Sequence, residues 1–176
     1  EDNEEPIVAI ASDPELTSYQ VMMFHKQDAT PDSLKNDVSY WLSQYVISLV
    51  TSMQNDRLQE LTQKSNPPFV YGYSYYDDYY VAPTKDAWTS VVIPKDAEGI
   101  EEAIAAMVAE TKRMQQYGFT ASEYERAKAD FMKSIESAYN ERNNTENSKH
   151  VDACLNHFLS NEPMMGIETE YMFYQQ

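Results

Sequence analysis

A double proline divides the middle of the chain into two patterns that one element cannot hold. Before it, apolar residues recur every three or four positions from Val38 to Met53, which predicts a long amphipathic helix. "RLQELTQKS" continues it as a helical turn or a second helix. Pro67 and Pro68 stop this pattern, because proline lacks a backbone donor and restricts its predecessor. Residues 69–80, "FVYGYSYYDDYY", then alternate aromatic with small side chains and predict a strand.

The flanking segments add further elements. "LTSYQVMMFHK" is rich in β-formers and predicts an earlier strand, and "DAWTSVVIP" predicts a hairpin partner after a turn at Pro83. Thr30 is expected to cap the long helix, with Pro31 at its first position. Helical spacing resumes at residues 100–117, where Gly118 suits the helix end. The capping box "TASE" opens another helix, and further helices are expected near residues 151–159 and 168–176.

This order, β-α-β-β-α-α, predicts an α+β fold in which an antiparallel sheet has helices packed on one face. It is most of a β-α-β-β-α-β unit whose final strand is missing, which suggests a piece of a longer polypeptide. Residues 1–6 are expected to be a tail and residues 7–176 a single domain.

The charge of the chain restricts its partners. A net charge of −16 disfavours binding to nucleic acid and to anionic lipid. An acidic, solvated surface is the simpler explanation, and attraction of cationic peptides is the alternative. No apolar run approaches the roughly 18 residues that cross a bilayer. The first residues, "EDNEEP", do not form a signal peptide, so the compartment cannot be read directly.

Catalytic chemistry is not apparent in the sequence. The three histidines, His25, His150 and His157, do not form an HxxEH or HxxxH motif. His150 and the single cysteine, Cys154, share a helix face, but a surface histidine and a buried, inert thiol are the favoured interpretation. There is also no GxSxG nucleophile motif. We therefore predict neither a metal site nor a catalytic residue in this chain.

Tyrosine is unusually frequent, with 14 residues. Tyr71, Tyr73 and Tyr75 fall on one face of the predicted strand, and Tyr76 points the other way. These three residues would form an aromatic wall that contacts peptide side chains. The alternative, which we favour, is a half-buried strand packed on the helices.

Three stretches together carry a resemblance to a known family. "DPELTSYQVMMFHK", "NDRLQELTQKSNPPF" and "YGFTASEYERAKADF" resemble the insulinase/pitrilysin zinc metallopeptidases, which include the mitochondrial processing peptidase. The similarity spans residues 7–166. It implies the processing-peptidase fold, in which homologous domains are paired. One domain carries an inverted HxxEH zinc site, and the next is metal-free and closes the chamber from the other side.

The resemblance also assigns two positions. In metal-free domains that grip substrate, the "RL-x-EL" helix leads to an arginine and, after six further residues, a tyrosine. Thr62 and Phe69 occupy these positions here. Threonine has no guanidinium group and phenylalanine no hydroxyl, so both substitutions remove the gripping function.

The resemblance therefore implies a non-catalytic structural domain of a zinc endopeptidase. Such a domain helps to enclose a peptide-degrading chamber and docks on the catalytic domain of the same polypeptide, where zinc is bound. We expect no activity from this chain alone. Family members that carry an "NPPF" segment resemble bacterial envelope enzymes, which implies a periplasmic or envelope-lipoprotein parent. The competing hypothesis is a stand-alone peptide- or protein-binding module that uses the tyrosine strand. A long parent reading frame with HxxEH upstream would favour the first hypothesis.

Overall fold

The computed structural model describes residues 5, 7–11, 13–15, 17–82 and 84–175. The predicted turn residue Pro83 and most of the 1–6 tail lie outside these residues. Within the described part, no helix combines the length and the apolar character needed to cross a membrane.

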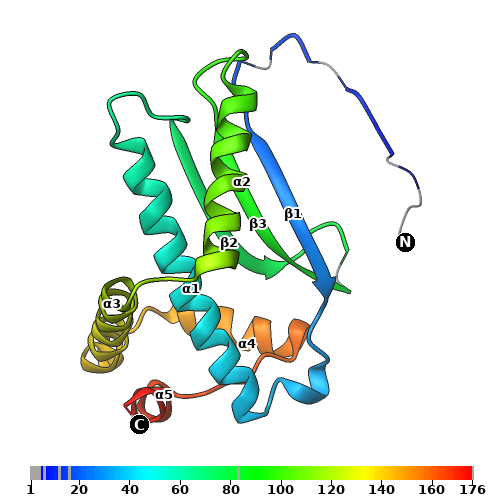
Figure 1. The fold of residues 1–176 in the computed structure, drawn as a ribbon. Helices are drawn as coiled ribbons and strands as arrows, with labels where there is room; N and C mark the ends of the chain where they lie inside the picture. Colours follow the sequence, from blue (N-terminus) through cyan, green and yellow to red (C-terminus); the bar gives the residue numbers. More distant parts are fainter. Residues whose placement is uncertain (1–4, 6, 12, 16, 83, 176) are drawn as a thin grey trace.

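Three antiparallel strands form the sheet of this α+β fold (Figure 1). Strand β1 spans Val21–Asp28, β2 spans Tyr71–Asp78 and β3 spans Lys85–Ile93. β3 lies in the middle of the β1-β3-β2 order and pairs with both neighbours. The predicted hairpin is therefore present, and the first strand pairs with its second arm.

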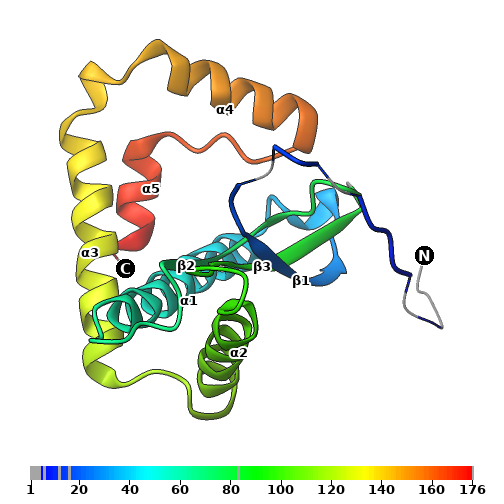
Figure 2. The ribbon, with the colours of Figure 1, turned by 90° about the horizontal axis from the view of Figure 1, so that it is seen from above.

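The described residues form five α-helices, of which α1 and α2 lie against the sheet and α3, α4 and α5 lie beyond it (Figure 2). α1 and α2 cover one face of the sheet, α3 packs across α1, and α5 packs on α3. Two short 3-10 turns, η1 before α1 and η2 after α3, connect these elements. The bounds are η1 Asp32–Leu34, α1 Val38–Thr62, α2 Ile100–Tyr117, α3 Ala121–Asn140, η2 Arg142–Asn144, α4 Asn147–Ser160 and α5 Ile167–Tyr174.

The core has two parts, both built on α1. One lies between the sheet, α1 and α2 and consists of Leu58, Phe69, Val92, Ala103 and Met107. The other joins α1 to α3 through Leu49, Met53 and Ala127, with Tyr45, Phe119 and Phe131 around them. Burial of this apolar surface gives α1 its fixed position between sheet and helices.

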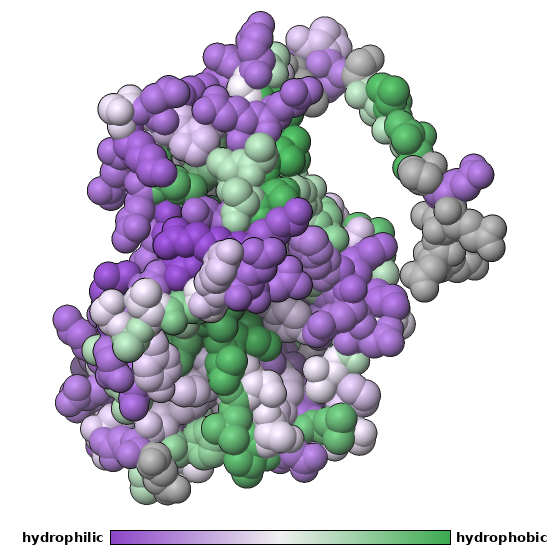
Figure 3. All heavy atoms as spheres, viewed as in Figure 1, coloured by the Kyte–Doolittle hydropathy of each residue, from purple (hydrophilic) through white to green (hydrophobic). Residues whose placement is uncertain are grey.

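The amino-terminal half of α1 is different, because one stripe of its apolar residues faces solvent. Val38, Leu42 and Val46 are 62%, 50% and 55% exposed. Their spacing of four residues places them on one stripe of the helix. Hydrophobic residues gather in a band over this part of the molecule in the lower half of Figure 3.

Several local predictions are confirmed. Thr120 caps α3 and forms the complete capping box with Glu123. Gly118 ends α2 with φ of +64°, a conformation that favours glycine. "RLQELT" continues the long helix as part of α1.

Other local predictions are wrong. Thr30 and Pro31 do not open the long helix: Pro31 precedes η1, and α1 begins only at Val38 after Asp37. The long helix also ends at Thr62, before the two prolines. Cys154 is exposed, as is most of α4, in which no residue is buried, so the expected buried thiol is wrong.

Candidate functional site

The face of the sheet that points away from the helices carries the predicted tyrosines. On β2, Gly72 and Ser74 are buried. The Ser74 hydroxyl lies 3.9 Å from the Met107 sulfur on α2, so this set of side chains faces the helices. Because side chains alternate along a strand, Tyr71, Tyr73 and Tyr75 face the opposite side. β2 is thus a half-buried strand that packs against α1, as the favoured alternative expected, and the three tyrosines share the face opposite Gly72 and Ser74.

The three tyrosine rings form a ladder along β2. The ring centroids of Tyr71 and Tyr73 are 5.5 Å apart, and those of Tyr73 and Tyr75 are 6.0 Å apart with nearly parallel planes. Tyr71 is 47% exposed, and the other two are half-buried. Flat aromatic surface is therefore available on this face for contact with a partner.

The other two strands, β3 and then β1, complete this surface, which we call the outer sheet face. On β3, Thr89 and Val91 lie opposite Tyr75 and Tyr73 and are buried. On β1, Phe24 and Met22 stand opposite the same two residues from the other side. The outer sheet face thus has small, covered side chains in the middle and larger ones along both edges: Met22, Phe24, Tyr71, Tyr73 and Tyr75.

Thr62 and Phe69 do not join the outer sheet face. The Thr62 hydroxyl donates to the Gln59 carbonyl of its own helix at 2.7 Å. Phe69 is fully buried in the core between sheet and helices. Its ring also fills the space above Gly72, where an added Cβ would lie 2.9 Å from the Phe69 Cε2 atom. The structure therefore does not bring these two side chains together on one surface.

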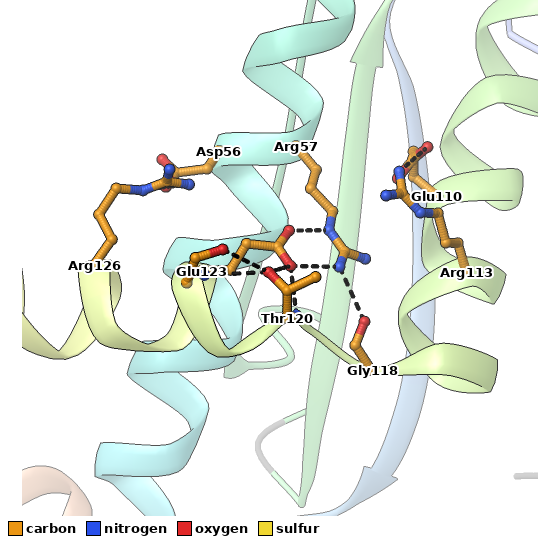
Figure 4. Close-up of polar contacts among 9 residues, drawn as sticks. Asp56, Arg57, Glu110, Arg113, Gly118, Thr120, Glu123 and Arg126 are labelled. Carbon is orange, nitrogen blue, oxygen red and sulfur yellow. Dashed lines mark hydrogen bonds and ion pairs between the residues drawn. The ribbon is translucent and has the colours of Figure 1, made fainter.

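The two segments that carry the family resemblance meet at a buried ion pair (Figure 4). Arg57 on α1 donates through Nε to Glu123 Oε1 at 2.5 Å and through Nη2 to Oε2 at 2.9 Å. The Arg57 side chain is 6% exposed and that of Glu123 is 16% exposed. Nη2 also donates to the Gly118 carbonyl at 3.0 Å, and the guanidinium group lies over the Phe119 ring.

Glu123 is held by α3 itself as well as by α1. Its Oε2 accepts from the Thr120 backbone N–H at 2.7 Å and from the Thr120 hydroxyl at 2.8 Å. The Arg57 hydrogen bond, supported by those of Thr120 and opposed by burial, lowers the pKa of Glu123 to about 2. The same pair raises the pKa of Arg57. One carboxylate thus caps α3 and fixes the angle between α1 and α3.

A third candidate is a cavity of about 580 Å³ at the end of the sheet, between the start of α1 and the end of α4. Tyr76 donates to Asp86 Oδ2 at 2.9 Å within its wall, and Gln27 donates to the Tyr76 hydroxyl. Burial, together with the Asp86 hydrogen bond, raises the pKa of Tyr76 to about 12. Burial and the nearby Asp86 charge also raise the pKa of Asp78. The lining is therefore polar and rich in carboxyl groups.

In the part of the chain that the structure describes, no group of three or more His, Cys, Asp or Glu side chains is placed to hold a metal ion. His150 and Cys154 lie on α4, and both are exposed.

Comparison with known proteins shows a likeness in fold. No family model and no curated protein matches the sequence. Among solved structures, the periplasmic protease PqqL from Escherichia coli matches with a TM-score of 0.78 and 20% identity, over 92% of this chain and 17% of that chain. The first half of the same protease matches with the same TM-score and identity, and 33% of its length is covered. The chain thus spans a small part of that enzyme, and it has the fold of one part of the first half of a periplasmic protease.

Proposed function

We propose that this chain is a non-catalytic structural domain of a zinc metallopeptidase of the insulinase/pitrilysin type. In this role it helps to enclose the peptide-degrading chamber and docks on the catalytic domain of the same polypeptide. The observation that carries the proposal is the likeness in fold, which covers 92% of this chain but only 33% of the first half of a periplasmic protease. A match over most of one chain and a small part of the other is typical of one domain within a multidomain enzyme.

The surroundings of Thr62 and Phe69 support a domain without the gripping pair. The Thr62 hydroxyl is bonded within α1, and the Phe69 ring is enclosed by core residues. Neither side chain is placed to hydrogen-bond a peptide backbone or a transition state. In this proposal, zinc and the groups that act on the substrate belong to the catalytic domain, and the parent protein works in the periplasm or bacterial envelope.

The exposed stripe on α1 supports a docked domain. Val38, Leu42 and Val46 present adjoining apolar surface of the kind that marks contacts between proteins or domains. The outer sheet face, with its tyrosine ladder, is the surface through which such a domain would line the chamber.

The proposal is tested by the metal content of the intact protein. Replacing the three exposed histidines together, His25→Gln, His150→Gln and His157→Gln, should leave one zinc per polypeptide and chelator-sensitive peptide cleavage. Metal analysis after dialysis gives the stoichiometry, and cleavage of a labelled unstructured peptide gives the activity. An intact protein without zinc, or a triple variant that loses its zinc while it stays folded, would contradict the proposal.

The second candidate function is a stand-alone peptide- or protein-binding module. The observation in its favour is the position of Tyr71, Tyr73 and Tyr75 on the face opposite the helices. A parent reading frame close to the length of this chain would favour it. In that case the triple alanine variant of these tyrosines should lose peptide binding and keep its helical circular dichroism.

A further inference from the structure

Helix α4 is attached to the rest of the molecule in an unusual way. None of its residues is buried. Its larger apolar side chains, among them Leu155 and Phe158, are 49% and 85% exposed. Apolar packing, which holds α1 and α2 on the sheet, therefore contributes little to the position of α4.

Polar contacts at the carboxyl end of α4 replace this packing. Lys35, just before α1, donates from Nζ to the Ser160 carbonyl at 2.5 Å and lies 3.2 Å from Glu162 Oε1. Tyr40 on α1 donates to Glu162 Oε2 at 2.7 Å. Within the segment itself, His157 Nδ1 and the Glu162 carbonyl are 2.7 Å apart. We call the group formed by Lys35, Tyr40 and Glu162 the latch.

The segment that leads into α4 is bound to the α3–α5 layer. Arg142 in η2 donates to the Tyr139 carbonyl at 2.7 Å and pairs with Glu168 at the start of α5. The Tyr139 and Tyr171 rings stack with centroids 4.5 Å apart. These contacts do not involve Lys35, Tyr40 or Glu162. The chain before α4 is therefore anchored in the helical layer, and the chain at the end of α4 is held by the latch.

The cavity lies under the latched end. Its wall includes Asn156, Leu159 and Ser160 of α4, together with Lys35, Tyr40 and Asp86 from the body of the molecule. Asn161, which follows α4, has φ of +54°, so the chain turns sharply there. Movement of α4 away from Lys35 would therefore open the cavity to solvent without disturbing the strands.

We propose that α4 is a strap over this cavity and that the latch keeps it closed. The Lys35 side chain is only 13% exposed, whereas that of Glu162 is 37% exposed. Partly exposed ion pairs contribute modestly to stability. The strap therefore opens in a local reaction that is more frequent than global unfolding. This inference does not depend on the peptidase proposal.

Hydrogen exchange followed by mass spectrometry on the intact protein tests the strap. Glu162→Gln and Lys35→Met each remove the ion pair and nearly preserve side-chain size. Peptides from residues 147–160 should exchange about fivefold faster in either variant, the scale of one partly exposed ion pair. Peptides from β3 and α2 should be unchanged. The double variant should accelerate exchange by less than the product of the two single effects, because both changes break the Lys35–Glu162 pair.

The matched control is Asp56→Asn, which removes the exposed Asp56–Arg126 pair of similar length on the other side of α1. It should leave exchange in residues 147–160 unchanged. Unchanged exchange of these residues in both latch variants would overturn the proposal. So would acceleration that appears equally in β3, since the latch would then stabilise the whole fold instead of the strap, and so would additive effects in the double variant.

Discussion

Arg57 shows how one side chain sets the relation between two helices. Its guanidinium group meets both carboxylate oxygens of Glu123 and the Gly118 carbonyl, while Nη1 has no partner in the described structure. Planar, two-pronged contact is what distinguishes arginine from lysine at such a position. The "RL-x-EL" and "GFTASE" segments therefore meet at the junction of α1 and α3, where this pair has a structural role.

Removing the carboxylate should destabilise the domain strongly. Glu123→Gln leaves the buried Arg57 charge unpaired, and we expect a loss of about 3 kcal/mol in the free energy of unfolding. Urea denaturation measures it. Asp56→Asn breaks an ion pair whose two side chains are 46% and 51% exposed, and should cost below about 1 kcal/mol. Equal losses in the two variants would contradict a special role for the Arg57–Glu123 pair.

The same pair predicts a pH dependence of stability. The pKa of Glu123 falls from its ordinary value of 4.5 to about 2 in the folded protein. A lowered folded-state pKa gives stabilisation that is complete above the unfolded-state value and is lost as pH falls through the folded-state value. The wild type should therefore lose this contribution between about pH 4.5 and pH 2. The difference in stability between wild type and Glu123→Gln should shrink over that interval, and a constant difference would argue against the assignment.

At the scale of elements, the β2–β3 hairpin is fitted to the core through Gly72. Phe69 precedes the strand and turns its ring back over this glycine, so the ring closes the space between β2 and the helices. A side chain at position 72 would occupy the place of the ring. The close contact between Phe69 and Gly72 explains why a glycine is suitable within a strand that otherwise carries large aromatic residues.

Gly72→Ala should force the Phe69 ring to move, since the new Cβ would lie 2.9 Å from Cε2. We expect a loss of about 1–3 kcal/mol from overpacking. Phe69→Leu in the same chain should recover part of it, so thermal denaturation of the wild type, the two single variants and the double variant should give non-additive losses. Gly166→Ala is the matched control, because its Cβ would meet only the Glu168 carboxylate at 3.5 Å and should cost little. Strict additivity would contradict the Phe69–Gly72 contact.

Much of the order of helices and strands was predictable from local signals. Which face of each element is covered by its neighbours was not. The capping box at Thr120 and the glycine at 118 act within a few residues, so their sequence pattern was sufficient. Alternation along residues 71–75 defined two faces of a strand, but only the packing of α1 and α2 determines which face is covered. The helical spacing around Cys154 likewise predicted an apolar stripe without showing that nothing in the described chain packs against it.

At the scale of the whole molecule, the proposed role separates the fold of this domain from contact with the substrate. A domain can preserve a fold while the residues that contact substrate change, so fold alone does not decide activity. Here Thr62 is the last residue of α1, and Phe69 lies in the core. The proposal assigns this domain to support and enclosure, with transition-state contacts made elsewhere.

Thr62→Ala in the intact protein tests this division directly. The variant removes a hydroxyl that bonds only to the Gln59 carbonyl, so kcat/KM should stay within a few-fold of wild type because no transition-state hydrogen bond is lost. The measurement uses a labelled unstructured peptide at a temperature where both proteins are folded. Leu58→Ala, in the buried core of the same helix, should instead destabilise the domain by about 2–5 kcal/mol and reduce the amount of active enzyme. A hundredfold fall in kcat/KM for folded Thr62→Ala, about 2.7 kcal/mol of lost transition-state stabilisation, would show that position 62 acts on the substrate.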